Sequence, residues 1–294
     1  MMFDYRLKVF HTVASRLSFT RASDELNISQ PAVTKHIKEI ENQLHTRLFD
    51  RKGTSIQLTP SGKILFEYAE KIRNIYRDLE FEISQMNQQY KGKLIIGAST
   101  TVAQYVLPEI LAKFKSYYKD LRIELIAHNT EMISELLKEG KIDLGIIEGE
   151  SQSSYFEYRK FKRDEIVLVA KSGHPLVHKT IHVQDLYSVD LVFREHGSGS
   201  LEFIQNRLKE NGIDTDKLNV VMQLGSSESI KNYLLHSESM AFLSISTVLN
   251  ELKNNLFSIV DIKNFTIERD FHFILPKGEQ SDLIRLFLKF ADVN

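Results

Sequence analysis

The residues from 29 to 41, SQPAVTKHIKEIE, combine side chains that can hydrogen-bond to nucleic-acid bases with the apolar spacing of a helix. Gln30 can pair bidentately with adenine, Thr34 can contact a thymine methyl group, and Lys35 can reach guanine or a phosphate. The N-terminus of a helix also favours a phosphate. This stretch therefore predicts a helix that reads the major groove of double-stranded DNA. The residues predicted to contact DNA are Ser29, Gln30, Pro31, Ala32, Thr34, Lys35, Lys38 and Arg51.

A helix-turn-helix is predicted to position these residues. Apolar residues at steps of three and four mark a first helix from Phe3 to Leu17. Ser18 is the expected N-cap of a second, short helix that ends at Asn27, and Ser29 is the expected N-cap of the third helix. A tight turn between two such helices is typical of the helix-turn-helix motif. The buried side of the third helix is predicted to consist of Val33, Ile37, Ile40 and Leu44.

Residues 45–62, HTRLFDRKGTSIQLTPSG, predict a turn and a small β-wing. Arg47, Arg51 and Lys52 of this wing would lie beside the DNA backbone or in the minor groove. Residues 1–60 carry nine lysine and arginine residues against six acidic ones, a modest bias that suits a polyanionic partner. The alternative is a winged three-helix domain that binds protein. The exposed Gln, Thr and Lys favour DNA, because a protein interface would need an apolar patch there.

The composition limits the classes of protein that this chain can belong to. A chain of 294 residues is long enough for two or three domains, and 42% apolar with 26% charged residues is typical of a soluble globular protein. The absence of cysteine excludes disulfides, thiol catalysis and thiolate metal sites. No apolar run approaches the length of a membrane span, and the start MMFDYRLKVF lacks the pattern of a signal peptide. We therefore expect a cytoplasmic protein that does not associate with membranes.

A long helix is predicted after the wing, because Pro60 suits the first position of a helix and a regular apolar pattern follows it. Seven residues alternate steps of four and three, which is a heptad pattern. A helix of about 30 residues would be about 45 Å long and would need a partner along its apolar side, for which a second copy of the chain is the simplest candidate. The alternative is a single helix that lies on the C-terminal domain. The residues predicted to form the dimer contact are Leu65, Ala69, Ile72, Tyr76, Leu79, Ile83 and Met86.

From residue 91 the pattern changes to strands that alternate with helices, which favours an α/β fold with mostly parallel sheets. The predicted strands are Leu94–Ala98, Ile123–Ala127, Asp143–Ile147, Ile166–Ala170, Leu191–Phe193, Val220–Leu224, Met240–Leu243 and Phe271–Leu275. Two further segments, 155–163 and 263–269, alternate polar and apolar residues and could each cross between two lobes. Ligands in such folds bind beyond the C-terminal ends of strands, near helix N-termini.

Catalysis and metal binding find little support in the sequence. The segment HGSGS is not a G-x-S-x-G nucleophile elbow, and no P-loop or dinucleotide fingerprint is present. His174, His178 and His182 are spaced by four, but Pro175 and the surrounding SGHPLVHKT favour a loop, and no cysteine or well-spaced carboxylate completes a metal site. We therefore expect a protein without catalytic residues, metal or cofactor.

The first 60 residues, with SFTRASDELNISQPAVTKHIKEIENQL and LFDRKGTSIQLTPSG, resemble LysR-type transcriptional regulators, and the order of the later segments fits that family. The resemblance implies a winged helix-turn-helix domain at 1–59, a dimerising linker helix at 60–90 and an effector-binding domain like a periplasmic binding protein at 91–294. It implies one lobe at 91–160 with 269–294 and another at 161–268. It also implies promoter DNA with an interrupted inverted repeat, and a homodimer or a homotetramer built as a dimer of dimers.

Five segments of the C-terminal domain are similar to the subgroup of activators of sulfur assimilation and relatives tied to carbon fixation. They are IGASTTVAQYVLP, NTEMISELL, DLGIIEG, REHGSGS and VVMQLGSSESIK. One departure is Ser239, where the subgroup usually has glycine, so the wall of the pocket there is expected to differ.

The resemblance implies an effector cleft lined from both lobes, and hydroxyls with free backbone N–H groups at strand-to-helix junctions favour an oxyanion or a small carboxylate. Glu148 would oppose a fully anionic ligand unless a hydroxyl, an ammonium or a protonated oxygen of the ligand faces it. Ordinary helix capping is the alternative role for these serines and threonines. For the whole chain, the alternative is a small-molecule-binding module or a degenerate enzyme with an N-terminal protein-interaction domain. The predicted effector-binding residues are Ser99, Thr100, Thr101, Glu148, Gly197, Ser198, Gly199 and Ser200.

Overall fold

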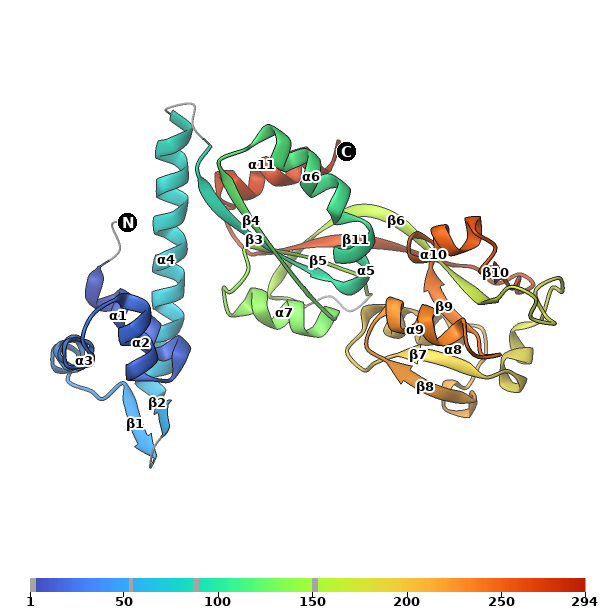
Figure 1. The fold of residues 1–294 in the computed structure, drawn as a ribbon, viewed down its shortest axis with the longest axis horizontal. Coiled ribbons are helices and arrows are strands. Elements are labelled where there is room, and N and C mark those ends of the chain that lie inside the picture. Colours follow the sequence, from blue (N-terminus) through green and yellow to red (C-terminus); the bar gives the residue numbers. More distant parts are fainter. Residues whose placement is uncertain (1–3, 53–54, 87–89, 150–152, 294) are drawn as a thin grey trace. The chain divides into compact units, whose positions relative to one another are not determined.

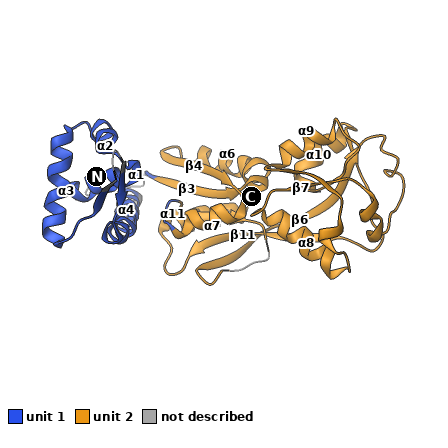
Figure 2. Ribbon diagram, turned by 90° about the horizontal axis from the view of Figure 1, so that it is seen from below, with its two compact units in different colours: residues 1–92, 139–141 blue, residues 93–138, 142–294 orange. Residues whose placement is uncertain are grey.

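The computed structural model describes residues 4–52, 55–86, 90–149 and 153–293. The chain divides into two compact units, one of residues 1–92 with 139–141 and one of residues 93–138 with 142–294 (Figure 2). The first unit contains three short helices, a two-stranded wing and a long helix, and the second is an α/β domain (Figure 1). Within the described residues, no helix is long and apolar enough to span a membrane.

The first unit has three short helices, of which the second and third are capped where the sequence predicts. The three are α1 (Tyr5–Arg16), α2 (Phe19–Leu26) and α3 (Gln30–Leu44). The Ser18 side chain accepts a hydrogen bond from the Arg21 backbone N–H, and Ser29 accepts one from Ala32. Asn27 has a left-handed φ of 52°, which ends α2. These caps fix the angle at which α3 leaves the turn.

The core of this unit forms between the three helices and the wing. Its most buried residues are Val9, Phe10, Val13, Ala22, Val33, Leu48 and Ala69, and Ile37 is nearly as buried. The wing consists of β1 (Phe49–Lys52) and β2 (Ser55–Leu58), which pair antiparallel. The prediction that Leu44 lies in the core was wrong, because it is the last residue of α3 and its side chain is 50% exposed.

The long helix α4 (Pro60–Met86) has an apolar face that differs from the predicted one in its first turns. Ala69 is fully buried in the core of the winged domain, and Leu65 packs against the same core. These two residues therefore do not belong to an exposed dimer contact, since their own chain covers them. The large apolar residues of α4 that remain exposed are Ile64, Tyr68, Ile75, Leu79, Ile83 and Met86.

The second unit is built on a mixed sheet with the strand order β10-β6-β11-β5-β3-β4, and β9 also pairs with β6. Strands β3 and β5 are parallel, whereas β11 runs antiparallel to both β5 and β6. Strands β7 and β8 form a separate parallel pair. The strands are β3 (Gly92–Ser99), β4 (Leu121–His128), β5 (Leu144–Ile147), β6 (Phe156–Lys171), β7 (Leu191–Arg194), β8 (Val220–Leu224), β9 (Ala241–Ser244), β10 (Phe257–Ile259) and β11 (Ile267–Pro276).

Two lobes share this sheet, and β6 and β11 run from one lobe to the other (Figure 1). Lobe I contains β3, β4 and β5 with α5 (Thr100–Tyr105), α6 (Leu107–Tyr117), α7 (Thr130–Lys138) and α11 (Asp282–Ala291). Lobe II contains β7, β8, β9 and β10 with α8 (Gly199–Glu210), α9 (Ser227–Leu234) and α10 (Ile245–Lys253), and with short 3₁₀ turns at Val183–Ser188 and Thr215–Lys217.

The crossing strands differ in extent from the prediction. Residues 155–163 and 166–170 are predicted as separate strands, but β6 runs through both because Asp164 is buried as the partner of Arg269 instead of ending the strand. The second crossing strand begins at Ile267 and continues to Pro276, so most of the predicted segment 263–269 precedes it. Both crossing strands are antiparallel to their neighbours, which corrects the prediction of mostly parallel sheets.

Candidate functional site

The outer face of α3 carries most of the residues predicted to contact DNA. Ser29, Gln30, Pro31, Lys35 and Lys38 are exposed, whereas Ala32 and Thr34 are half-buried. The Thr34 hydroxyl donates a hydrogen bond to the Gln30 carbonyl at 3.1 Å. Arg51 lies in β1, but its side chain lies outside the described residues. A hollow of about 510 Å³ runs along this face, lined by Gln30, Pro31, Thr34, Lys35, Lys38, Glu39 and Asn42.

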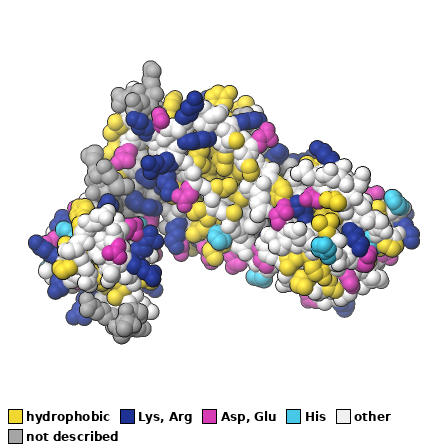
Figure 3. Space-filling view, in the orientation of Figure 1, with side chains coloured by type: hydrophobic (Ala, Val, Ile, Leu, Met, Phe, Trp, Pro, Cys, Tyr) yellow, Lys and Arg dark blue, Asp and Glu magenta, His cyan; other side chains and the backbone are white. Residues whose placement is uncertain are grey.

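The face of α3 is polar without being strongly basic. Glu39 lines the same hollow as Lys35 and Lys38, and it lies 3.6 Å from the His36 ring nitrogen Nδ1. Lysine, arginine and acidic side chains are interspersed on the visible face of this domain (Figure 3). A helix with this surface would select a DNA sequence through hydrogen-bond donors and acceptors such as Gln30 more than through net charge.

Glu148, directly after β5 of lobe I, is the centre of a buried network between the lobes. Its carboxylate accepts hydrogen bonds from the Ser200 hydroxyl of α8 at 2.7 Å and from the Thr101 hydroxyl of α5 at 3.3 Å. The Arg269 guanidinium lies 2.9 Å from its other oxygen. Three of the predicted effector residues, Thr101, Glu148 and Ser200, are therefore brought together, but they bond to one another.

Arg269 of β11 supplies the positive charge of this network. It is also 2.8 Å from the buried carboxylate of Asp164 on β6, and it donates to the Ser200 hydroxyl at 2.9 Å. The Ser244 hydroxyl of lobe II donates to Asp164 at 2.6 Å. A buried carboxylate needs a partner of opposite charge, and the Arg269 guanidinium lies within ion-pair distance of both Glu148 and Asp164. The sequence-based expectation that Glu148 opposes an anionic ligand is thus weakened by a cation that the sequence did not reveal.

A second buried arginine, Arg194 at the end of β7, joins the lobes beside this network. Its side chain is 3% exposed, and it donates to the Thr100 hydroxyl of α5 at 3.0 Å. It also pairs with the Glu195 carboxylate at 2.8 Å. Ser99 precedes Thr100 and is the N-cap residue of α5, but its side chain makes no capping hydrogen bond. Capping therefore does not explain the Ser99 hydroxyl.

The turn before α8 fits tightly against lobe I. Gly197 has a φ of +82°, and its carbonyl accepts a hydrogen bond from the Glu131 backbone N–H at 3.3 Å. A side chain at Gly199 would collide with the carbonyl oxygen of Glu148. Ser198 caps α8 by accepting a hydrogen bond from the Leu201 N–H, so the capping alternative is correct for this residue. The two glycines allow the close approach of the lobes.

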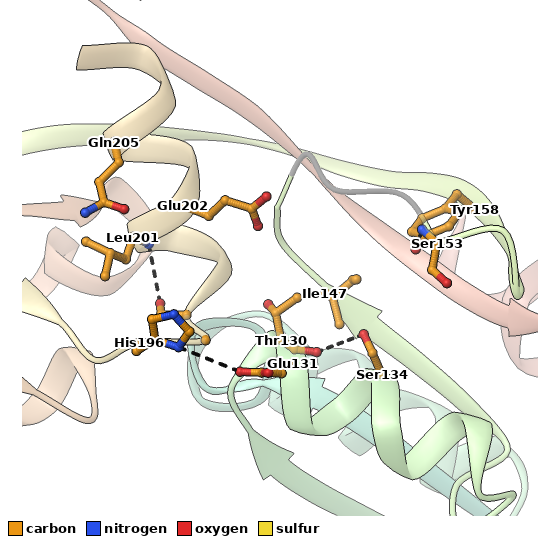
Figure 4. A pocket seen from close by; sticks show the side chains of 12 residues that line it. Thr130, Glu131, Ser134, Ile147, Ser153, Tyr158, His196, Leu201, Glu202 and Gln205 are labelled. Carbon is orange, nitrogen blue, oxygen red and sulfur yellow. Dashed lines mark hydrogen bonds and ion pairs between the residues drawn. The ribbon is translucent and has the colours of Figure 1, made fainter. Parts of the chain in front are cut away.

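A pocket of about 490 Å³ lies between α7 of lobe I and α8 of lobe II (Figure 4). It contains two of the predicted effector residues, Gly197 and Ser198, whereas Ser99, Thr100 and Thr101 are not among the residues that line it. Lobe I contributes Thr130, Glu131, Ser134, Ile147, Ser153 and Tyr158, and lobe II contributes His196, Gly197, Ser198, Leu201, Glu202 and Gln205. Two carboxylates, several hydroxyls and one histidine line this pocket. Because the two carboxylates would repel an anion, the pocket suits a ligand group that donates hydrogen bonds better than a negatively charged one.

Sequence reasoning missed Arg194, Arg269, Glu131 and Glu202. A lone arginine at a strand end has the same sequence pattern as a solvated surface charge, and only the fold places Arg194 and Arg269 between the lobes. The glutamates on the first turns of α7 and α8 are typical of helix N-termini, so nothing in their spacing marks them as lining a pocket.

The fold joins a winged helix-turn-helix, a long helix and a two-lobed α/β domain, an arrangement that suits a DNA-binding protein with a ligand-binding domain. Residues 5–63 match the bacterial regulatory helix-turn-helix protein, lysR family, and residues 87–293 match the LysR substrate binding domain. The chain therefore belongs to the LysR family of transcriptional regulators.

Three similar proteins are informative. The regulator CysL of Bacillus subtilis is 33% identical over 290 residues, which are 98% of this chain and 96% of CysL. A probable RuBisCO transcriptional regulator of Synechocystis is 34% identical over 289 residues, which are 97% of this chain and 84% of that protein. The structure of the Synechocystis CcmR regulatory domain in complex with 2-PG has a TM-score of 0.63 and 27% identity, and the match covers 68% of this chain and 96% of that one. The subgroup resemblance seen in the sequence is thus confirmed.

Proposed function

We propose that this LysR-type regulator binds promoter DNA through α3 and that a small anionic metabolite, held between the lobes of its second unit, modulates this binding. The observation that carries the DNA-binding part is the outer face of α3, where exposed Gln30, Lys35 and Lys38 line one hollow with Thr34. These residue types hydrogen-bond to bases and phosphates. In a helix-turn-helix, the N-terminal residues of the second helix contact the bases, and Gln30 lies in the first turn of α3.

The anionic character of the effector is supported by the arrangement between the lobes and by one relative. The CcmR regulatory domain, 27% identical to this chain, has been solved in complex with 2-PG. In this chain, buried arginines and hydroxyls meet between the lobes, and both kinds of donor suit an oxyanion or a small carboxylate. Sulfate, thiosulfate, phosphate, 2-PG and small carboxylates are therefore the first ligands to test.

The assembly that we propose is a homodimer formed through α4, with a tetramer as a dimer of dimers. Support comes from the exposed apolar face of α4, where Ile64, Tyr68, Ile75, Leu79 and Ile83 recur at helical spacing. A second copy would bury these side chains and place two copies of α3 on the two halves of an interrupted inverted repeat. The protein would act in the cytoplasm by binding, without catalysis, metal or cofactor.

A selection experiment tests the DNA-binding part. Full-length protein is incubated with random duplex DNA, and bound DNA is separated by gel shift and sequenced over several rounds. Enrichment of a palindromic motif is the expected result, because two symmetric subunits read two half-sites. Failure to enrich any sequence would refute the proposed function at the DNA level. Calorimetric titration with the anions named above then tests the effector-binding part.

A further inference from the structure

A buried lysine of lobe II, Lys231 on α9, is held in place by the neighbouring helix α10. Its side chain is 8% exposed, and its ammonium group donates a hydrogen bond to the Thr247 carbonyl at 3.0 Å and lies 2.8 Å from the Glu251 carboxylate. A buried ammonium is unfavourable unless it is paired, and these two contacts both pair it and fix its position. Lobe II therefore holds this positive charge at a fixed place without help from lobe I.

Tyr105, the last residue of α5 in lobe I, lies over this charge. Its ring centroid is 5.0 Å from the Lys231 nitrogen Nζ, a distance typical of a cation–π contact. Its hydroxyl donates a hydrogen bond to the carboxylate of Glu228, the residue of α9 that pairs with Lys231 at 2.8 Å. A single side chain of lobe I thus contacts both members of an ion pair of lobe II.

Tyr105 is attached firmly to lobe I. Its helix α5 packs against α6 and β4 of that lobe, and Val106, which joins α5 to α6, is 6% exposed. Because close-packed interiors resist the movement of a single element, Tyr105 moves with lobe I as a body. A rearrangement that separates α5 from α9 must therefore break the contacts of Tyr105 with Glu228 and Lys231. These contacts lie at the C-terminal end of α5 and share no residue with the network around Glu148.

We propose that Tyr105, Glu228 and Lys231 form a latch that holds the two lobes in the arrangement of this structure. The latch sets how strongly the second unit favours this arrangement in protein without bound effector. A ligand that favours another arrangement has to overcome the latch, so the strength of the latch also affects how much of the protein responds. The latch itself needs no effector, and only its effect on DNA binding rests on the proposed function.

Distances between spin labels on the two lobes test the latch. Because the chain contains no cysteine, Ala112→Cys on α6 and Lys209→Cys on α8, both at exposed positions, provide one label on each lobe. Full-length labelled chains are mixed with an excess of unlabelled chains, so that pulsed EPR measures distances within one chain. Tyr105→Leu, which removes the ring and the hydroxyl, is expected to shift or broaden the distance distribution, and Tyr105→Phe and Glu228→Gln are expected to change it less. Tyr117→Phe, which removes the hydroxyl of an exposed tyrosine of the same lobe, is the matched control and is expected to keep the parent distribution.

An unchanged distance distribution in Tyr105→Leu overturns the latch. If Tyr105→Leu does not fold, as judged by circular dichroism, Tyr105→Phe and Glu228→Gln decide, because each removes or weakens one contact and leaves the core intact. The parent distribution in both of these variants then overturns the latch.

DNA affinity separates the latch from the proposed function. In protein without added anion, Tyr105→Leu is expected to change the affinity for the selected duplex about two-fold or more, because the proposed function couples the lobe arrangement to DNA binding. A changed distance distribution with unchanged DNA affinity leaves the latch in place and contradicts that coupling.

Discussion

Glu70 on α4 is a buried carboxylate that contacts His11 of α1 and Arg73 one turn along α4. Burial raises the pKa of Glu70, but the hydrogen bond from His11 and the charges of His11 and Arg73 outweigh burial and hold its pKa below the ordinary value of about 4.5. His11 also stacks on Phe66 of α4. The pair of Glu70 and His11 therefore ties α1 to the start of the long helix.

A lowered pKa in the folded state predicts how stability depends on pH. The ionised Glu70 stabilises the winged domain above its unfolded pKa, and this contribution is lost as pH falls through the lower folded pKa. Glu70→Gln is expected to lower the thermal midpoint of this domain at neutral pH, and the difference from wild type is expected to shrink at about pH 3. Thermal unfolding of both proteins at the two pH values measures this. Glu67→Gln, at an exposed position of α4, is the control, and a constant Glu70→Gln deficit at both pH values would contradict the linkage.

On α3, the helix proposed to bind DNA, Gln30 offers a matched comparison within one element. Gln30 lines the hollow on α3, whereas Gln43 is exposed near the end of the same helix and does not line it. Gln30→Ala is expected to weaken binding to the selected sequence by about 1–3 kcal/mol and to relax base preference at one position. Gln43→Ala is expected to leave both unchanged. Fluorescence anisotropy with the selected duplex and single-base variants provides the measurement, and equal losses in the two variants would contradict base reading by Gln30.

The residues of α3 and of the lobe boundary differ in how far the sequence predicts them. The local sequence is enough to predict the positions of Ser29, Gln30 and Lys35, because a cap residue and a helical period place them outside the core. The local sequence does not predict the positions of Arg194 and Arg269, because their partners Thr100 and Glu148 lie 94 and 121 residues away in the chain. The same difference explains Ser99, whose unused hydroxyl is visible only once the contacts around α5 are known.

The elements show a similar difference. Helix periodicity predicts α4, but it does not say which apolar residues the winged domain covers, so Leu65 and Ala69 are assigned to the wrong surface. Strand periodicity predicts β3, β4 and β5, but it divides β6 at Asp164. A charged residue in the middle of a buried strand is unfavourable without a partner, and the sequence does not show that Arg269 is the partner of Asp164. Elements that depend on distant charges are therefore predicted less well than those that depend on local pattern.

The exposed face of α4 leads to a prediction about assembly. Ile75 and Leu79 are exposed in the isolated chain, so replacing both by lysine leaves the fold of one chain intact while placing charge in the proposed dimer contact. Ile75→Lys with Leu79→Lys is expected to lower the mass measured by light scattering to that of one chain and to weaken binding to the palindromic site. Glu67→Lys changes the net charge by the same amount outside the apolar face and serves as control. An unchanged mass in the double variant would refute this contact.

At the scale of the whole molecule, regulation requires that the effector distinguish two arrangements of the lobes. The second unit holds its lobes together by Ser200 and Glu148, by Arg194 and Thr100, and by close packing of Gly199. A ligand that binds one lobe alone gives binding without a signal, whereas one that enters between the lobes shifts the balance between arrangements. The size of that shift is a coupling free energy, typically about 1–3 kcal/mol.

Because coupling is reciprocal, the effector and the promoter must change one another's affinity by the same factor. We expect the anion that binds wild type to change affinity for the selected duplex about five-fold or more, and saturating duplex to change anion affinity by that same factor. Thr101→Val removes the hydroxyl that bonds to Glu148 and keeps nearly the same volume, so it is expected to retain DNA binding and to lose most of the coupling. Anisotropy with and without anion, and calorimetry with and without duplex, measure the two factors. Full coupling in Thr101→Val would show that the signal does not pass through the boundary around Glu148, and it would leave the other contacts between the lobes as its route.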